Sequence, residues 1–230
     1  MSPRRRDPRA QLALIDAAAR LLAEEGPQAL STRRLAAETG GSTMAVYTYF
    51  GGMGGLVREI VYEGFRRLDA SLAGLAWTDD PVADMALLGR MYRHNARANP
   101  HLYAAMFGGL ALGGFSLTEQ DRQHGRYTLV RVVECAHRCI AAERFRPADP
   151  QLVAHQMWIT THGLVNLELG NYLTEPCDAE RCFETLLVSL MVSVGDSWAA
   201  ATGSVAASLV RFRRETEADA EADAEADAVR

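Results

Sequence analysis

The sequence predicts an all-α protein with a small N-terminal helical domain and a larger C-terminal helical domain. Apolar residues recur at intervals of three and four along most of the chain, which is the spacing of an amphipathic helix. No segment alternates apolar and polar residues as a half-buried strand does. With 230 residues, 48% of them hydrophobic, the chain can bury one substantial core and a smaller second one.

The first 70 residues contain the pattern of four helices, which defines a domain over residues 8–70. Leu12, Ile15, Ala19 and Leu22 form one apolar face of the first helix. Ser31 and Ser42 are suitable N-caps for two short helices, and Gly40-Gly41 between them permits a tight turn. The expected helices are residues 8–25, 31–38, 42–49 and 52–68.

The two short helices and their glycine turn have helix-turn-helix spacing. In that arrangement the second helix enters the major groove of DNA, and the first helix crosses the backbone. Val46 and Phe50 are expected to face the domain core with Leu35 and Ala36. The outward side chains have hydroxyl groups or a thioether that suit contacts to phosphates and bases; they are Ser42, Thr43, Met44, Tyr47 and Thr48. Thr32 and Arg33 add a helix N-terminus and a cation for a phosphate.

The charge distribution fits this interpretation. The formal net charge is -5 at pH 7, but residues 215–230 hold seven acidic residues against one arginine, so the rest of the chain is nearly neutral. Arg4, Arg5 and Arg6 form a basic arm over residues 1–7, ahead of the first helix, and such arms often bind nucleic acid. A plain solvated tail is the alternative. The repeated Glu-Ala-Asp-Ala unit predicts a disordered, or at best frayed helical, acidic tail over residues 215–230.

Residues 8–65 resemble the DNA-binding domain of the TetR (tetracycline-repressor-like) family. The segments Thr39-Gly40-Gly41-Ser42 and Val46-Tyr47-Thr48-Tyr49-Phe50 match the family's motif in register. The resemblance implies that Tyr47 and Thr48 contact phosphates, that Thr43 and Met44 touch bases, and that Phe50 lies in the core. The family commonly has Ser-Lys after the phenylalanine, whereas this chain has Gly51-Gly52. Backbone N–H groups at the start of the next helix are one possible replacement for that lysine.

The C-terminal domain is expected over residues 75–202. Proline-containing breaks separate expected helices at residues 81–98, 101–107, 118–143, 149–173 and 178–201, and glycine-rich residues 108–114 form a loop. The segment Trp158-Ile159-Thr160-Thr161-His162-Gly163 resembles the Trp-His-Gly class of C-terminal domains in the same family. We expect the last two helices to form a four-helix bundle with those of a second copy, with Gly163, Leu167 and Gly170 at a face of close approach.

An apolar cavity for a small-molecule effector is expected in the same domain, because pockets are mostly apolar with a few polar groups. An ordinary packed core is the alternative for these residues, and His162 also fits a buried histidine bonded to a neighbouring helix. The candidate lining is Leu88, Met91, His94, Met106, Phe107, Trp158 and His162.

Several functions are disfavoured by residues that the sequence lacks. It contains no lysine, no Gly-x-Ser-x-Gly and no His-Glu-x-x-His motif, so enzymes that need a catalytic lysine are excluded. We expect no enzyme activity and no cofactor. Cys135, Cys139, Cys177 and Cys182 lack Cys-x-x-Cys spacing, so we expect reduced thiols and no metal. No apolar run of membrane-spanning length or signal peptide is evident, which favours a cytoplasmic protein that does not bind a membrane.

The sequence therefore predicts a transcriptional regulator, and the family resemblance implies a repressor, with an activator as the alternative. It would bind palindromic double-stranded operator DNA as a homodimer, and a small apolar or amphipathic ligand would release it. Two other interpretations stay open: a helical enzyme or ligand carrier with a vestigial helix-turn-helix domain, and a helical module that binds a protein partner.

Overall fold

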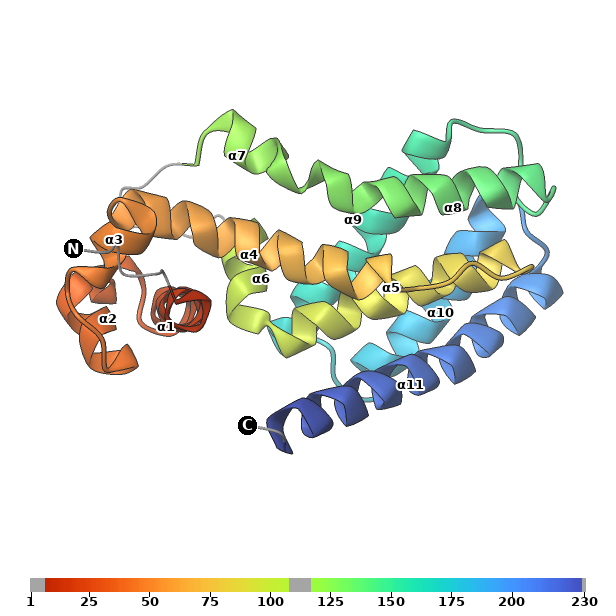
Figure 1. The fold of residues 1–230 in the computed structure, drawn as a ribbon. Coiled ribbons are helices and arrows are strands. Elements are labelled where there is room, and N and C mark those ends of the chain that lie inside the picture. Colours follow the sequence, from red (N-terminus) through yellow and green to blue (C-terminus); the bar gives the residue numbers. More distant parts are fainter. Residues whose placement is uncertain (1–6, 108–116, 229–230) are drawn as a thin grey trace. The chain divides into compact units, whose positions relative to one another are not determined.

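The computed structural model describes residues 7–107 and 117–228, without the side chains of Arg122 and of residues 218–228. All regular elements of these residues are helical (Figure 1), as the sequence predicts. They are α1 (Pro8–Glu24), η1 (Pro27–Ala29), α2 (Thr32–Thr39), α3 (Ala45–Phe50), α4 (Met53–Ala73), α5 (Pro81–Ala98), α6 (Pro100–Phe107), α7 (Glu119–Gln123), η2 (His124–Leu129), α8 (Val130–Ala141), α9 (Pro150–Leu169), α10 (Ala179–Ser193) and α11 (Trp198–Ala228). The predicted basic residues Arg4, Arg5 and Arg6 and the glycine-rich loop 108–114 lie outside the described residues.

The chain divides into two compact units. Unit 1 comprises residues 1–70 and 98–127, and unit 2 comprises residues 71–97 and 128–230. The expected domains were continuous segments, residues 8–70 and 75–202, whereas the structure assigns residues 98–127 to unit 1. The physical reason is the packing of α6, because Leu102 and Ala105 are part of the same buried cluster as α1.

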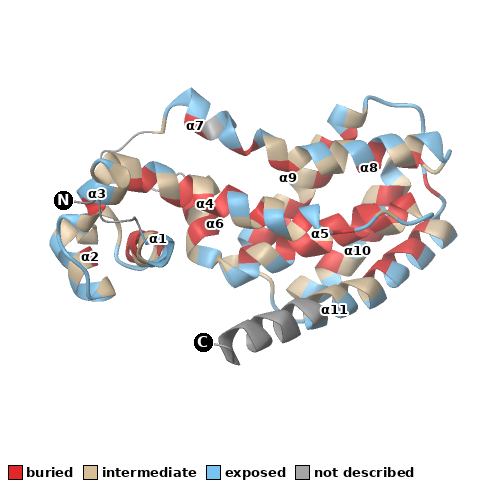
Figure 2. Ribbon diagram, viewed as in Figure 1, coloured by how far each residue is buried: buried red, intermediate tan, exposed pale blue. Residues whose placement is uncertain are grey.

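The core of unit 1 is a compact apolar cluster (Figure 2). Ile15, Ala19 and Leu22 of α1 are fully buried, as expected, but Leu12 is 41% exposed and lies outside the core. The buried side of α1 is instead completed by residues one position away, Leu14, Ala18 and Leu21. The helical period was therefore correct, and the centre of the buried face was displaced from Leu12.

Two glycines allow close packing within unit 1. A Cβ atom on Gly64 of α4 would lie 2.3 Å from the sulfur of Met106, and one on Gly125 of η2 would lie 2.0 Å from the Phe65 ring. Phe65 also meets Phe107 edge to face, with ring centroids 5.7 Å apart. These contacts fix α6 and η2 against α4.

Two breaks interrupt segments that the sequence predicted as continuous helices. The expected helix 118–143 consists of α7, the 3₁₀ segment η2 and α8. The expected helix 178–201 ends at Ser193, and Gly195 then adopts a φ of +126°, which favours glycine. A Cβ atom there would lie 2.7 Å from the backbone nitrogen of Arg146, so the turn is also tightly packed.

Helix α11 follows this turn and continues to Ala228. In the described part of the predicted acidic tail, residues 215–228, the backbone is helical, which is the second of the two states that the sequence left open. The repeated alanine and glutamate residues have high helix propensity, and they continue a helix that is already nucleated by packing further upstream. Among the described side chains of α11, those of Ala201, Ser204, Val205 and Ser208 are buried in unit 2.

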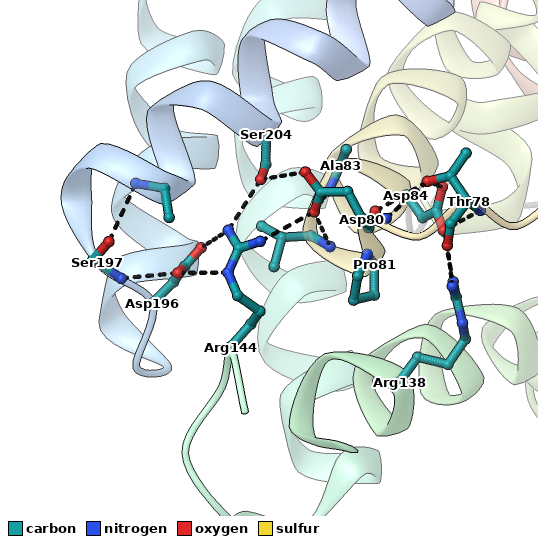
Figure 3. Close-up of polar contacts among 12 residues, drawn as sticks. Thr78, Asp80, Pro81, Ala83, Asp84, Arg138, Arg144, Asp196, Ser197 and Ser204 are labelled. Carbon is teal, nitrogen blue, oxygen red and sulfur yellow. Dashed lines mark hydrogen bonds and ion pairs between the residues drawn. The ribbon is translucent and has the colours of Figure 1, made fainter. Parts of the chain in front are cut away.

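A polar network joins α11 to α5 and α8 within unit 2 (Figure 3). Asp84 is only 2% exposed and receives hydrogen bonds from Arg138 at 2.6 Å and Arg211 at 2.8 Å. Arg144 donates to Asp196 at 2.6 and 2.9 Å and to Ser204 at 3.0 Å. These charges replace their lost hydration with direct partners, which buried charges require.

Candidate nucleic-acid interface

Helix α2 begins and ends as its sequence predicts. The Ser31 hydroxyl accepts a hydrogen bond from the Arg34 N–H at 3.2 Å, which caps the helix. Gly40 has a φ of +64°, and the Gly41 N–H donates to the carbonyl of Ala36 at 3.0 Å. This left-handed ending turns the chain sharply toward α3.

Helix α3 is shorter than the expected range 42–49. Residues 43 and 44 form a turn, and the regular helix begins at Ala45. The Ser42 hydroxyl still accepts from the Met44 N–H at 3.1 Å, and the Ala45 N–H donates to the Ser42 carbonyl at 2.9 Å. Ser42 therefore stabilises the tight turn from which α3 starts.

The predicted inner and outer faces of this segment are those of the structure. Val46 is 1% exposed and packs in the unit 1 core with Leu35, and Phe50 is partly buried. The Met44 side chain is 62% exposed and that of Tyr47 is 57% exposed. Ser42, Thr43 and Thr48 are exposed as well. The side chains predicted to contact DNA thus project from the short helix and its first turn into solvent.

The two neighbouring arginines of α2 have different surroundings. Arg34 pairs with Glu25 at 3.0 Å and with Glu38 at 3.0 Å, which ties α2 to the end of α1. Arg33 is exposed and has no ion pair with any residue whose side chain the structure describes. Thr32 beside it is partly buried. Arg33 is therefore the arginine of this pair that can bind a phosphate without first breaking an internal ion pair.

A contact that the sequence did not reveal fixes the last residue of the basic arm. The Asp7 N–H donates to the Tyr49 hydroxyl of α3 at 3.2 Å, and the Asp7 carboxylate caps α1 by accepting from the Arg9 N–H at 2.9 Å. The tyrosine at position 49 was visible in the motif, but its partner lies 42 residues away. The chain thus enters α1 directly beside α3.

The glycines that replace the family's Ser-Lys pair shape the start of α4. Gly51 and Gly52 have φ values of +73° and +134°. A Cβ atom on Gly55 would lie 1.9 Å from the carbonyl oxygen of Phe50, so only glycine allows α4 to begin this close to α3. The first N–H groups of α4 are thereby placed next to residues 42–49, which we call the recognition segment. N–H groups at a helix start attract anions.

The seven predicted ligand-pocket residues are distributed over both units. Met106 and Phe107 belong to unit 1, where Met106 lies against Gly64. Leu88 and Met91 are buried in the core of unit 2. His94 is exposed and meets the ring of Phe212 edge to face, at 5.6 Å between centroids.

Trp158 and His162 form the remaining part, a small aromatic and polar cluster in unit 2. The Tyr92 hydroxyl lies 2.9 Å from Nδ1 of His162, and the ring centroids of Trp158 and His162 are 5.9 Å apart. Burial lowers the pKa of His162 from its ordinary value, which favours the neutral imidazole. The sequence left open that His162 is a histidine bonded to a neighbouring helix, and its hydrogen bond with Tyr92 of α5 agrees with that alternative.

Unit 1 also contains a groove that the sequence analysis missed. Its volume is about 590 Å³, and charged and polar side chains from α1, α2, α4 and the start of α6 line much of it. Arg20 and Glu38 on its wall pair with each other at 2.5 Å, and Arg67 pairs with Asp16 at 2.8 Å. Ion-paired side chains thus form part of its wall, and none of the seven expected pocket residues lines it.

Comparisons with known proteins identify the class. Residues 14–60 match the family described as bacterial regulatory proteins of the tetR family, and residues 85–190 match the tetracyclin repressor-like C-terminal domain. Together the two matches span more than half of the chain. The chain therefore belongs to the TetR family of DNA-binding transcriptional regulators. Helix α11 lies beyond both matches. A search of curated proteins gave no significant relative.

Solved structures share the fold at low sequence identity. A protein of unknown function from Rhodococcus sp. RHA1 is 24% identical, with a TM-score of 0.68 over 85% of this chain and 100% of its own. The TetR family regulator PfmR from Thermus thermophilus is 19% identical, with a TM-score of 0.62 over 80% and 99%. The fatty acid degradation regulator FadR from Bacillus halodurans is 18% identical, with a TM-score of 0.65 over 82% and 97%.

Proposed function

We propose that this regulator is a repressor that binds palindromic operator DNA as a homodimer and is released by a small apolar or amphipathic ligand. The observation that carries the proposal is the exposed row Thr43, Met44, Tyr47 and Thr48, supported from behind by buried Val46. In a helix-turn-helix domain these positions face the major groove. We place its activity in the cytoplasm, where operator DNA is accessible. No helix in the described ranges has the length and apolar character needed to cross a bilayer.

Within this proposal the side chains have two kinds of role. Tyr47, Thr48, Ser42 and the Thr32–Arg33 helix start contact phosphates, which sets the register on the duplex. Thr43 and Met44 contact base edges, with the Met44 thioether against a thymine methyl group. Arg4, Arg5 and Arg6 add nonspecific attraction, and the Asp7–Tyr49 hydrogen bond supports an arm that starts beside α3.

The test of DNA recognition is selection of binding sites from random duplex DNA with the full-length protein. We expect a palindrome whose half-sites are about 34–36 Å apart, because a dimer presents two recognition segments one helical turn apart. No enrichment, together with no binding to duplex DNA at low salt, would contradict the regulator function and favour the carrier or protein-interaction alternatives.

Variants separate the two kinds of contact. We expect Tyr47→Ala to weaken binding to all sequences, and Thr43→Ala or Met44→Ala to change the preferred sequence by about 1–3 kcal/mol at one position. Val210→Ala is the control, since Val210 is a large apolar residue of unit 2 that is 61% exposed. Alanine at Arg4, Arg5 and Arg6 should flatten the salt dependence, whereas alanine at exposed Arg213 and Arg214 should not.

The homodimer is supported by an apolar stripe on α9. Leu152, Ile159 and Leu167 are 57%, 62% and 47% exposed, and Gly163 between them has open space around it. Large exposed apolar residues in a row mark interfaces. We expect Ile159→Glu to produce folded monomers in sedimentation and to reduce operator affinity. Val130→Glu, at a residue of α8 that is 63% exposed, is the matched control and should leave the dimer intact.

Ligand release is supported by the cluster of Tyr92, Trp158 and His162, where a neutral imidazole suits an apolar or amphipathic molecule. A ligand that favours one conformation of the dimer lowers operator affinity by its difference in binding free energy. Effector and operator must therefore weaken each other equally in titrations. Independent binding of the two would contradict this part of the proposal.

A further inference from the structure

Two of the four cysteines lie together on the surface of unit 2, at the start of α10. The Asp178 carboxylate caps this helix by accepting a hydrogen bond from the Arg181 N–H at 2.8 Å. Cys177 immediately precedes the cap, and Cys182 is the fourth residue of the helix. Residues at these two positions often pack against each other across a capped helix start. The Cys182 thiol accordingly donates to the carbonyl oxygen of Cys177, with sulfur and oxygen 3.3 Å apart.

The other two cysteines provide an internal contrast. Cys135 and Cys139 are 0% exposed in the core of unit 2, and the Cys135 thiol donates to the Pro81 carbonyl at 3.2 Å. A hydrogen bond with Cys139, together with burial, raises the pKa of Cys135, which makes it unreactive at neutral pH. Cys177 is exposed and Cys182 is partly exposed. A dissolved oxidant therefore reaches the surface pair and not the buried pair.

We propose that Cys177 and Cys182 form a reversible redox site that a hydroperoxide converts into an intramolecular disulfide. The Cys177 sulfur attacks the peroxide oxygen, the O–O bond breaks, and a sulfenic acid and one molecule of water or alcohol form. The Cys182 thiol then attacks the sulfenic sulfur, the S–S bond forms, and water leaves. The two thiols together lose two electrons and two protons, and the peroxide gains them. A dithiol reductant reverses the reaction.

The site is connected to the interior of unit 2 through the first turn of α10. Glu180, between the two cysteines, pairs with Arg93 of α5 at 2.6 Å. Phe183 follows Cys182 directly and is 1% exposed. Its ring centroid lies 4.8 Å from the Arg93 guanidinium carbon. Closing the disulfide restrains the turn that carries these anchoring residues. The redox state of the pair thus acts on the attachment of α10 to α5.

The test uses the full-length reduced protein, treated with hydrogen peroxide, alkylated and digested with trypsin. Arg181 separates the two cysteines, so the disulfide joins peptide 145–181 to peptide 182–211. We expect this joined peptide, an intact mass lower by two hydrogens, and reversal by dithiothreitol. A bond that includes Cys135 or Cys139, a peroxide-dependent bond between two chains in its place, or intact surface thiols after oxidation would each overturn the proposal.

Single variants identify which of the two sulfurs is oxidised first. Because Cys177 is the more exposed, we expect Cys182→Ser to accumulate a sulfenic acid on Cys177 that dimedone labels. Cys177→Ser should show little labelling of Cys182. Cys139→Ala is the matched control and should still form the disulfide. The peptide map of the unsubstituted protein tests the proposal even if this buried variant does not fold.

Discussion

Units 1 and 2 are stabilised internally by different kinds of contact. Unit 1 has a continuous apolar core, and several of its arginine–carboxylate pairs, such as Arg34 with Glu25, lie at the surface. Unit 2 buries arginines as well as carboxylates: Arg90 is 3% exposed and Asp84 is 2% exposed. The Arg90 guanidinium donates hydrogen bonds to Glu184, to Ser208 and to the carbonyl of Val205. In unit 1 the buried carboxylates Glu63 and Asp121 pair with arginines that stay partly or well exposed. An arginine–carboxylate pair therefore contributes differently to stability in the two units.

The largest expected effect comes from a buried charge of unit 2. Asp84→Ala leaves Arg138 and Arg211 without their shared carboxylate, and breaking a buried ion pair costs about 3–5 kcal/mol. Hydrogen exchange of unit 2 amides and urea unfolding measure the loss. Glu25→Ala in unit 1 is the control, because its pair with Arg34 is exposed and should cost less than about 1 kcal/mol. Equal losses in the two variants would remove the proposed difference between the units.

A smaller effect is expected where unit 1 depends on close packing. Gly55→Ala places a Cβ atom 1.9 Å from the Phe50 carbonyl oxygen, so the backbone must shift, at a cost of roughly 1–3 kcal/mol. Gly203→Ala in α11 meets open space and should be neutral or stabilise the fold by up to about 1 kcal/mol. Thermal unfolding compares the two substitutions. A neutral Gly55→Ala would show that α4 does not need this close approach to α3.

A third prediction separates stability from recognition inside unit 1. Arg33→Ala should leave the unfolding free energy unchanged and reduce the salt slope of operator binding by about one unit, as for one lost phosphate contact. Arg34→Ala should instead lower stability by less than about 1 kcal/mol, because its pairs with Glu25 and Glu38 are exposed. Unfolding curves and salt titrations of both variants check this. Identical behaviour of the two arginines would contradict the assignment.

The smallest expected effect is a pH dependence in unit 1. Burial by itself raises the pKa of Asp121, but hydrogen bonds from Tyr62 and Thr118 and the charge of Arg58 outweigh it and lower the pKa from 3.8 to about 2. The stabilisation is therefore complete above pH 3.8 and is lost as the pH falls through about 2. Tyr62→Phe should move the pKa of Asp121 upward, as measured by a carboxyl-carbon NMR titration. An unchanged titration would show that the Tyr62 hydroxyl contributes little.

The recognition segment was predictable because its determinants are local. Ser31, Gly40 and Ser42 act on residues within a few positions of themselves, and the outward exposure of Met44 and Tyr47 follows from the helical period. Leu12 was misplaced because a period of three and four residues fits two adjacent faces of a short helix. Only the packing of α6 on α1 selects one of these faces.

The remaining errors involved partners that are distant along the chain. Nothing near Asp84 indicates that Arg211 pairs with it, because the two residues are 127 positions apart. The bond between Asp7 and Tyr49 was hidden in the same way. The helix breaks near residues 124 and 195 depend on Phe65 and Arg146, which occupy the space that a side chain at Gly125 or Gly195 would need.

The sequence by itself determined the helical class, the turn between α2 and α3, and the faces of α3, because caps, glycines and apolar periodicity act over a few residues. The tertiary structure decided that residues 98–127 pack with unit 1 and that α11 is fixed by buried arginines and carboxylates. Desolvated charges and close approaches depend on distances in space, which the order of residues alone does not specify.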